Sequence, residues 1–181
     1  MLETAEGVET VWTSVISWLL QVEAFPSSAA VRESLNGYPA LLSVHVISMC
    51  LFAGLVLMMD LRLVGIGNRG TPFRQLQKRL FPWQMAGMVI STITGLTLVY
   101  GDPIRFATNI FFLVKMVIML LAAVNALAFH YSTYLSIDKW EGRPALPFGA
   151  KWAGVLSVVL WVSVILSGRL IAYNWFDVDV R

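Results

Sequence analysis

Charged side chains are scarce in this sequence. Only 13% of its 181 residues are Asp, Glu, Lys or Arg, whereas 57% are hydrophobic and the mean hydropathy is +0.71. A soluble domain carries about 25% charged residues, so this chain lacks the charge needed to cover a water-facing surface. The composition also excludes disordered, collagen-like and coiled-coil chains. The sequence therefore predicts a membrane protein, of a size that allows one domain.

Metal ligands and thiols are also scarce. The chain has one cysteine, Cys50, and two histidines, His45 and His130. A single cysteine excludes a disulfide framework and a paired-thiol metal site, and the C-x-x-C-H motif of covalently attached haem is absent. The cysteine content therefore gives no information about the redox compartment.

Four stretches are long and apolar enough to cross a bilayer core, which needs about 20 mostly apolar residues. They cover residues 39–63, 80–101, 109–137 and 150–174. None of them shows the alternation of a membrane β-barrel, and backbone groups within lipid must be satisfied inside the segment itself. We therefore predict an all-α polytopic membrane protein in which residues 39–176 form a four-helix transmembrane bundle.

The N-terminal segment, residues 1–38, has a different pattern. Between Val8 and Gln21, apolar and polar side chains occupy opposite faces of a helix. The apolar run is too short to span, so we predict an amphipathic helix that lies in the membrane interface, anchored by Trp12 and Trp18. Acidic residues flank its start in place of the basic residues of a signal peptide, so a signal peptide is not expected.

The charges are distributed unevenly between the two sides of the predicted bundle. The loops at residues 60–79 and 138–151 carry five and three basic residues, against one and two acids, whereas the opposite side carries four basic residues against eight acids. Positively charged loops stay in the cytoplasm. We therefore expect a multi-pass protein of the bacterial inner membrane with both termini in the periplasm. The basic residues are too dispersed to form a nucleic-acid groove.

Ionisable residues within the spans are functional candidates, because a charge in lipid is expensive. His45 and Lys115 each lie six residues into parallel spans, about 9 Å from the outer end. Asp60 and His130 lie near the inner end, with Arg62 close to Asp60. The two histidines are thus separated by roughly 20 Å along the membrane normal, and we predict that they do not bind one metal.

The outer pair of residues is compatible with a haem b site. Haem in a helical bundle is held by side chains that project inward from facing helices. His45 would be an axial ligand, with Met49, Met116 or no residue opposite it, and Lys115 would lie beside it. Arginine suits the haem propionates because its forked donors match carboxylates. The arginines expected near the outer surface are Arg32, Arg105 and Arg169.

The same residues have structural interpretations. A histidine in a span can serve only to hydrogen-bond a neighbouring helix, and a lysine can extend to the membrane surface. On this interpretation Asp60 is the expected partner of His130. Asp60, His130 and Arg62 together are the second candidate site, and they lie near the inner end of the bundle.

Small residues form two patterns. Gly87, Ser91 and Gly95 recur every four residues in the second span, which predicts a face for close packing of another helix, within the chain or in an oligomer. The G-x-G-x-x-G sequence at residues 65–70 matches the dinucleotide-binding motif, but it follows a membrane helix instead of a strand. We therefore interpret it as a helix end and a turn.

Several short motifs follow one another along the chain. They are RES at 32–34, YP at 38–39, His45, DLRL at 60–63, RLFPW at 79–83, Gly95, Lys115 and NALAFH at 125–130. This order resembles a widespread family of uncharacterised bacterial four-helix membrane proteins, from about residue 27 to 175. The resemblance implies the four-helix fold and brings no established function.

The layout of His45, Arg62, Lys115 and His130 is also similar, more distantly, to the membrane protoporphyrinogen oxidase of the haem pathway and to copper-resistance D type membrane proteins. In the oxidase, a histidine of the first helix is implicated in binding haem b, and a lysine early in the third helix is also important. This resemblance implies that His45 binds haem b and that Lys115 contributes to the same site.

Three functions stay open from the sequence. The first is a haem b-binding protein with an electron-transfer or redox role near the outer leaflet, for which a quinone is one conceivable partner. The second is a non-catalytic subunit or scaffold of a larger membrane complex, and the third is a small transporter or metal-uptake protein. No motif identifies a substrate, so the sequence does not decide whether the protein is an enzyme.

Overall fold

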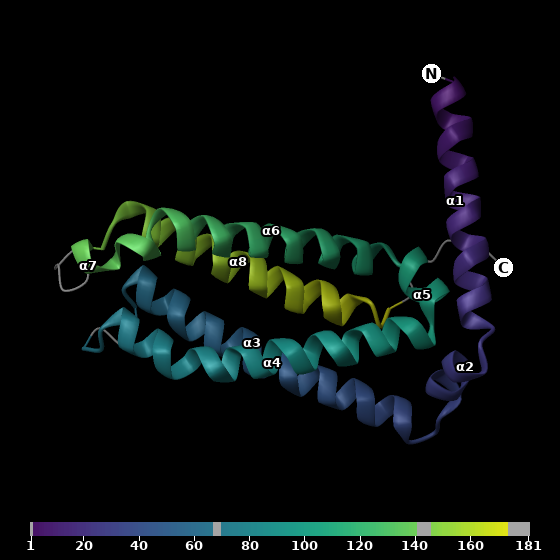
Figure 1. The fold of residues 1–181 in the computed structure, drawn as a ribbon, viewed down its shortest axis with the longest axis horizontal. Helices are drawn as coiled ribbons and strands as arrows, with labels where there is room; N and C mark the ends of the chain where they lie inside the picture. Colours follow the sequence, from purple (N-terminus) through teal and green to yellow (C-terminus); the bar gives the residue numbers. More distant parts are fainter. Residues whose placement is uncertain (1, 67–69, 141–145, 174–181) are drawn as a thin grey trace.

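A computed structural model describes residues 2–66, 70–140 and 146–173. All regular structure in these ranges is helical (Figure 1). The helices are α1 (Leu2–Glu23), α2 (Pro26–Glu33), α3 (Gly37–Val64), α4 (Phe73–Gly101), α5 (Pro103–Thr108), α6 (Ile110–Ser132), η1 (Tyr134–Ser136), α7 (Ile137–Trp140) and α8 (Phe148–Leu170).

Four of these helices, α3, α4, α6 and α8, are long and apolar enough to cross a membrane. They run side by side and form the bundle in Figure 1. The predicted all-α four-helix membrane architecture is therefore confirmed. The fourth span ends at Leu170, before the predicted boundary at 174, and residues 174–176 of the predicted bundle lie outside the described residues.

The four spans pack in the order α4, α3, α8, α6. Helix α3 packs against both α4 and α8, and α6 packs against α8. Small residues allow these close approaches: a Cβ atom at Gly87 of α4 would lie 3.0 Å from the Ser48 carbonyl oxygen of α3, and one at Gly154 of α8 would lie 3.0 Å from the Leu63 Cβ atom. Small residues at helix contacts are typical of membrane proteins, in which tight packing replaces the hydrophobic effect.

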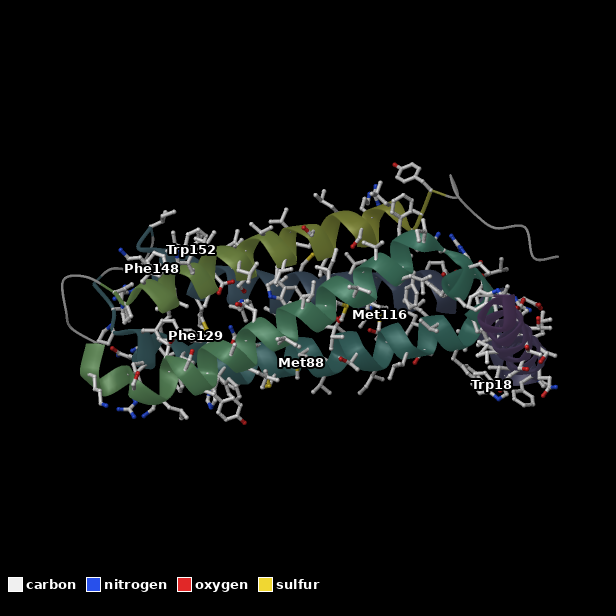
Figure 2. All side chains as sticks on the ribbon, turned by 90° about the horizontal axis from the view of Figure 1, so that it is seen from above. Trp18, Met88, Met116, Phe129, Phe148 and Trp152 are labelled. Carbon is white, nitrogen blue, oxygen red and sulfur yellow. The ribbon has the colours of Figure 1, made fainter. Side chains whose placement is uncertain are left out.

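The apolar side chains that point away from the bundle match a lipid environment. Leu96 of α4 and Leu120 of α6 are each 66% exposed in the isolated chain, and Figure 2 shows side chains projecting around the spans. A soluble protein rarely exposes apolar surface so extensively. In the bilayer these side chains contact lipid tails.

The span ends are defined by local features of the sequence. Helix α3 is capped by Gly65, whose φ of 90° lies in the left-handed region and whose N–H donates to the carbonyls of Leu61 and Arg62. This glycine cap confirms the helix-end interpretation of the G-x-G-x-x-G sequence, of which Gly67 lies outside the described residues. Helix α6 begins after Asn109, whose side chain accepts hydrogen bonds from the N–H groups of Phe111 and Phe112.

A compact apolar cluster closes the loop end of the bundle opposite α1. Its buried members are Leu63, Phe73, Ile137 and Ala150. The Phe73 ring makes edge-to-face contacts with Phe129 and Tyr134, at centroid distances of 6.0 and 6.3 Å. This packing explains why α4 begins at Phe73 and not at the predicted Leu80. About two additional, largely polar helical turns precede Leu80, and they place Phe73 in the buried cluster.

Candidate functional site

His45 lies on the face of α3 that packs against α4. Its ring is half-buried, and its Nδ1 atom is 3.0 Å from the carbonyl oxygen of Ser91 and 3.1 Å from the hydroxyl of Thr94. Both partners belong to the second span, one turn from each other. The histidine is therefore held between two membrane helices by polar contacts.

These contacts decide which ring nitrogen carries the proton. The Ser91 carbonyl oxygen can only accept, so Nδ1 must donate. The Thr94 hydroxyl uses its own hydrogen on the Ile90 carbonyl, at 2.7 Å, and it accepts from Nδ1 as well. His45 is therefore the Nδ1–H tautomer when neutral. Its Nε2 atom carries a lone pair, and no residue within the described ranges hydrogen-bonds to it.

Gly95 provides the room for this ring. A Cβ atom at Gly95 would lie 2.9 Å from Cε1 of His45 and 3.3 Å from Nδ1. Real Cβ contacts are longer, so any side chain at this position would displace the imidazole. The Gly87, Ser91 and Gly95 face is thus a packing face, as predicted, and it is occupied by α3 of the same chain. It does not remain available for an oligomer contact.

Lys115 projects from α6 toward α8 at the same end of the bundle. Its Nζ atom lies 3.6 Å from the position of a Cβ atom at Gly168. The side chain is half-buried and close enough to His45 for the two groups to interact electrostatically. Among the described residues, no ion pair or hydrogen bond holds its ammonium group.

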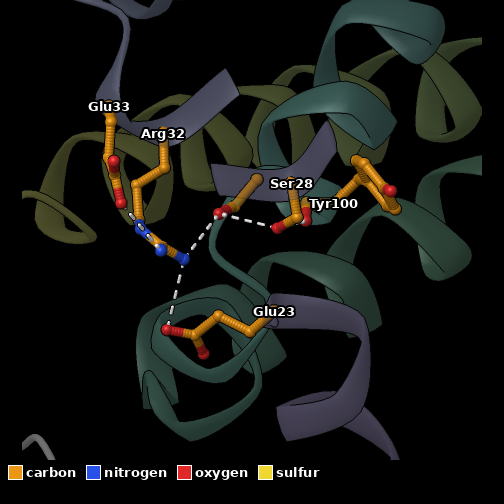
Figure 3. Close-up of polar contacts among 6 residues, drawn as sticks. Glu23, Ser28, Arg32, Glu33 and Tyr100 are labelled. Atoms are coloured by element: carbon orange, nitrogen blue, oxygen red, sulfur yellow. Dashed lines mark hydrogen bonds and ion pairs between the residues drawn. The ribbon is translucent and has the colours of Figure 1, made fainter. Parts of the chain in front are cut away.

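The three arginines expected near the outer surface differ in their surroundings. Arg32 is already engaged: its guanidinium lies 3.3 Å from Glu23 and 3.4 Å from Glu33, and it donates to the Gly101 carbonyl at 3.4 Å (Figure 3). Arg105 of α5 has a buried Nε atom without a hydrogen-bond partner in the described structure. Arg169 is exposed in the last turn of α8. Arg105 and Arg169 are therefore better placed than Arg32 to bind an added anionic group.

The second candidate site is not assembled as predicted. Asp60 is buried, with 7% of its surface exposed, and it accepts a hydrogen bond from Ser157 of α8. His130 is exposed and stacks on Tyr134, with ring centroids 5.3 Å apart. Arg62 donates from Nε to the Thr71 carbonyl at 3.1 Å. In the described parts of the chain, no hydrogen bond or ion pair joins these three residues to one another.

The partners of these side chains could not be identified from sequence. Serine and threonine are common in membrane helices, where they bond their own backbone or a neighbouring helix, and nothing local distinguishes Ser157 or Thr94 from the others. One interhelical contact near this level is the hydrogen bond that the Asn125 amide of α6 donates to the Ala153 carbonyl of α8 at 3.0 Å. Within the described residues there is no group of three His, Cys, Asp or Glu side chains that could hold a bare metal ion.

A comparison with protein families gives one match. Residues 37–174 match a family of unknown function, DUF6644. The chain belongs to this family. The DUF6644 region contains all four spans and therefore the surroundings of His45 and Lys115, whereas α1 and α2 precede it. The sequence-based identification of an uncharacterised four-helix family is thus confirmed.

No curated protein and no solved structure matches the chain. The likeness to the haem-pathway oxidase and to the copper-resistance D type proteins therefore stays a prediction. DUF6644 membership establishes the family of this protein without assigning it an activity.

Proposed function

We propose that this protein binds haem b in the half of the membrane nearer its termini and has an electron-transfer or redox role there. The observation that carries the proposal is the state of His45. Its Nδ1–H donates to the Ser91 carbonyl, which leaves the Nε2 lone pair free to bind iron. A histidine that ligates a metal almost always donates its other ring N–H to a carbonyl or carboxylate, which fixes the ring and raises its basicity.

The donor set near His45 fits haem better than a bare metal ion. Haem needs only one or two axial protein ligands, because the porphyrin supplies the others. Lys115 and the arginines Arg105 and Arg169 offer positive charge for the two propionates at this end of the bundle. Burial of the anionic propionates in lipid would otherwise be expensive. When bound, haem b supplies a one-electron redox centre within the membrane.

The proposal includes an orientation in the membrane. The loops at the opposite end of the bundle from α1 carry most of the basic residues, although Arg69 and Arg143 lie outside the described residues. By the positive-inside rule these loops lie in the cytoplasm. The His45 end and both termini would then face the periplasm of a bacterial inner membrane.

An absorption spectrum tests the proposal. The protein is purified after expression with haem supplied, and its haem is identified as the pyridine haemochrome. We expect a Soret band in the wild type and in His130→Ala, and its loss in His45→Ala. His130 is a matched control because it is the other histidine, and its ring is exposed, stacked on Tyr134 and edge-to-face with Tyr131. A colourless wild-type protein, or full haem content in His45→Ala, would refute the proposal.

If the protein is colourless, the two other functions, a complex subunit and a transporter, remain to be tested. A stable partner recovered in mild detergent would then support a subunit or scaffold. Transport into proteoliposomes would support a transporter or metal-uptake protein.

A further inference from the structure

Helix α1 runs across the direction of the four spans. Figure 1 shows it nearly perpendicular to the bundle at the end where α5 lies, and in Figure 2 it is seen almost along its own axis beyond the span ends. It contacts α2, α4 and α5. Its N-terminal half extends past the edge of the bundle. Since the spans define the membrane normal, α1 lies parallel to the membrane plane, at the level of one surface.

Only part of the apolar face of α1 is used by the rest of the protein. Ile16 and Leu19 are half-buried. Alongside them, Val11, Val15 and Trp18 form a row at helical spacing, and they are 65%, 41% and 61% exposed. These three side chains line a shallow groove on the helix surface together with Thr10 and Ser14. The row is therefore an apolar strip next to the bundle that the described residues of this chain leave exposed.

The polar face of α1 is uncharged and largely self-satisfied. Between Thr10 and Val22 the sequence contains no Asp, Glu, Lys or Arg. The Ser14 hydroxyl donates to the Thr10 carbonyl and the Ser17 hydroxyl to the Ser14 carbonyl, both at 2.8 Å. A face of this kind can lie among lipid headgroups, because it carries no charge that would need an oppositely charged partner. With no basic residue there, attraction to anionic lipid is not part of its binding.

The direction of α1 is fixed by a polar latch at its C-terminal end, formed by Glu23, Ser28, Arg32 and the last carbonyls of α4 (Figure 3). Ser28 is fully buried and donates to the Tyr100 carbonyl at 2.9 Å. Arg32 joins the Gly101 carbonyl of α4 to the Glu23 carboxylate of α1. The latch thus connects α1 through α2 to the end of a span, and it sets the level at which α1 leaves the bundle.

We propose that α1 lies in the interface of the leaflet nearest to it, with Val11, Val15 and Trp18 inserted among the lipids and the polar latch holding its angle. The occupant of the apolar strip is the bilayer surface, because α1 lies across the end of the bundle, at the level where the exposed apolar surface of the spans ends. Aromatic and aliphatic side chains on one face of a helix are the usual contacts of such interfacial helices. The proposal does not depend on haem binding.

Spin labels on the two faces of α1 test this placement. Cys50 is the single cysteine, so Cys50→Ser gives a background in which Val15→Cys and Ser17→Cys can be labelled one at a time. The labelled proteins are placed in phosphatidylcholine nanodiscs. Oxygen concentrates in lipid, whereas a nickel chelate stays in water. At the Val15 label we expect the collision rate with oxygen to be several-fold higher than that with the chelate. At the Ser17 label we expect the collision rate with the chelate to be the higher one. Ser17 is the matched control because it is two residues away in the same helix and lies on its opposite, exposed face.

Two results would overturn the proposal. Equal access of the nickel chelate to both labels would place α1 in water. A Val15 label that is immobile and shielded from both reagents would show that protein, and not lipid, covers the strip.

A further variant tests the latch. Arg32→Met removes the contacts to Glu23 and Gly101, and Glu33→Gln removes only the exposed ion pair on Arg32. We expect the oxygen preference of the Val15 label to fall in Arg32→Met and to persist in Glu33→Gln. The melting temperature of the bundle shows that both variants are folded. An unchanged oxygen preference in folded Arg32→Met would show that the latch does not orient α1.

Discussion

The imidazole of His45 rests on the bare backbone of Gly95, with Cε1 only 2.9 Å from the position that a Cβ atom would take. The contact joins α3 to α4 at the imidazole whose Nε2 atom has no hydrogen-bond partner among the described residues. Its tightness means that the position of His45 depends on the absence of a side chain on the neighbouring helix.

Gly95→Ala is therefore expected to displace His45 or to separate α3 from α4, at a cost of about 1–3 kcal/mol, as for overpacking of a core. The melting temperature in detergent should fall, and haem content should fall with it. Gly54→Ala is the control, because a Cβ atom at Gly54 would meet no atom within 4 Å and alanine favours the helix. Equal melting temperatures for the two variants would contradict the tight contact.

Thr94→Val tests the smaller contribution of the second contact to Nδ1. Valine keeps the shape of the side chain but cannot accept the 3.1 Å hydrogen bond, whereas the Ser91 carbonyl remains in place. Partners that orient a ligating histidine are worth about 10–100-fold in affinity, so we expect a loss of haem affinity of about tenfold, measured by haem titration. A loss as complete as that of His45→Ala would mean that Thr94 has a role beyond orienting the ring.

Ser157→Ala should destabilise the bundle near Asp60, at the end opposite α1. Asp60 has one carboxylate oxygen without a partner in the described structure, and its hydrogen bond to Ser157 satisfies the side chain only in part. Removing that donor leaves a buried carboxyl group without a hydrogen bond, which costs about 1–3 kcal/mol.

The control combines the change with Asp60→Leu. Once the carboxyl group is gone, Ser157→Ala should have little further effect on the melting temperature. Additive effects of the two substitutions would show that they do not act through a shared hydrogen bond.

Ser28→Ala should loosen the contact between α2 and the end of α4. The Ser28 hydroxyl reaches the Tyr100 and Gly101 carbonyls, at 2.9 and 3.3 Å, and the residue is fully buried. Loss of this donor leaves carbonyl groups at a helix end with fewer partners, again at about 1–3 kcal/mol. Hydrogen exchange should increase in α2 and in the last turn of α4. Ser27→Ala is the comparison, since Ser27 is exposed and its hydroxyl hydrogen-bonds to the Tyr100 hydroxyl instead of a backbone carbonyl at the helix end.

The sequence was sufficient for the spans because hydrophobic length is a local property. The helices α3, α4, α6 and α8 were all predicted. The largest differences are at three ends: α4 begins at Phe73 instead of 80, α6 ends at Ser132 instead of 137, and α8 ends at Leu170 instead of 174. Helix α5 was missed, since its six residues are too short for a periodic pattern. Depth along a helix also follows from residue counting, so the separation of His45 from the inner end could be predicted.

Side-chain partners were harder to predict, because they depend on the rotation of each helix about its axis. Residue counting placed Asp60 and His130 at one level and suggested a pair. In the fold, Asp60 faces α8 whereas His130 stacks outside the core on Tyr134. The latch of Ser28 and Arg32 joins residues about 70 positions apart, and no pattern in the sequence connects them.

The packing order α4, α3, α8, α6 divides the membrane domain into two antiparallel hairpins, α3 with α4 and α6 with α8. Each hairpin is contiguous in sequence and is built from consecutive spans. The contacts that orient His45 come entirely from the first hairpin, whereas Lys115 arrives with the second. We therefore expect the first hairpin alone to position the imidazole, and the second hairpin to bring Lys115 to it when α8 docks on α3.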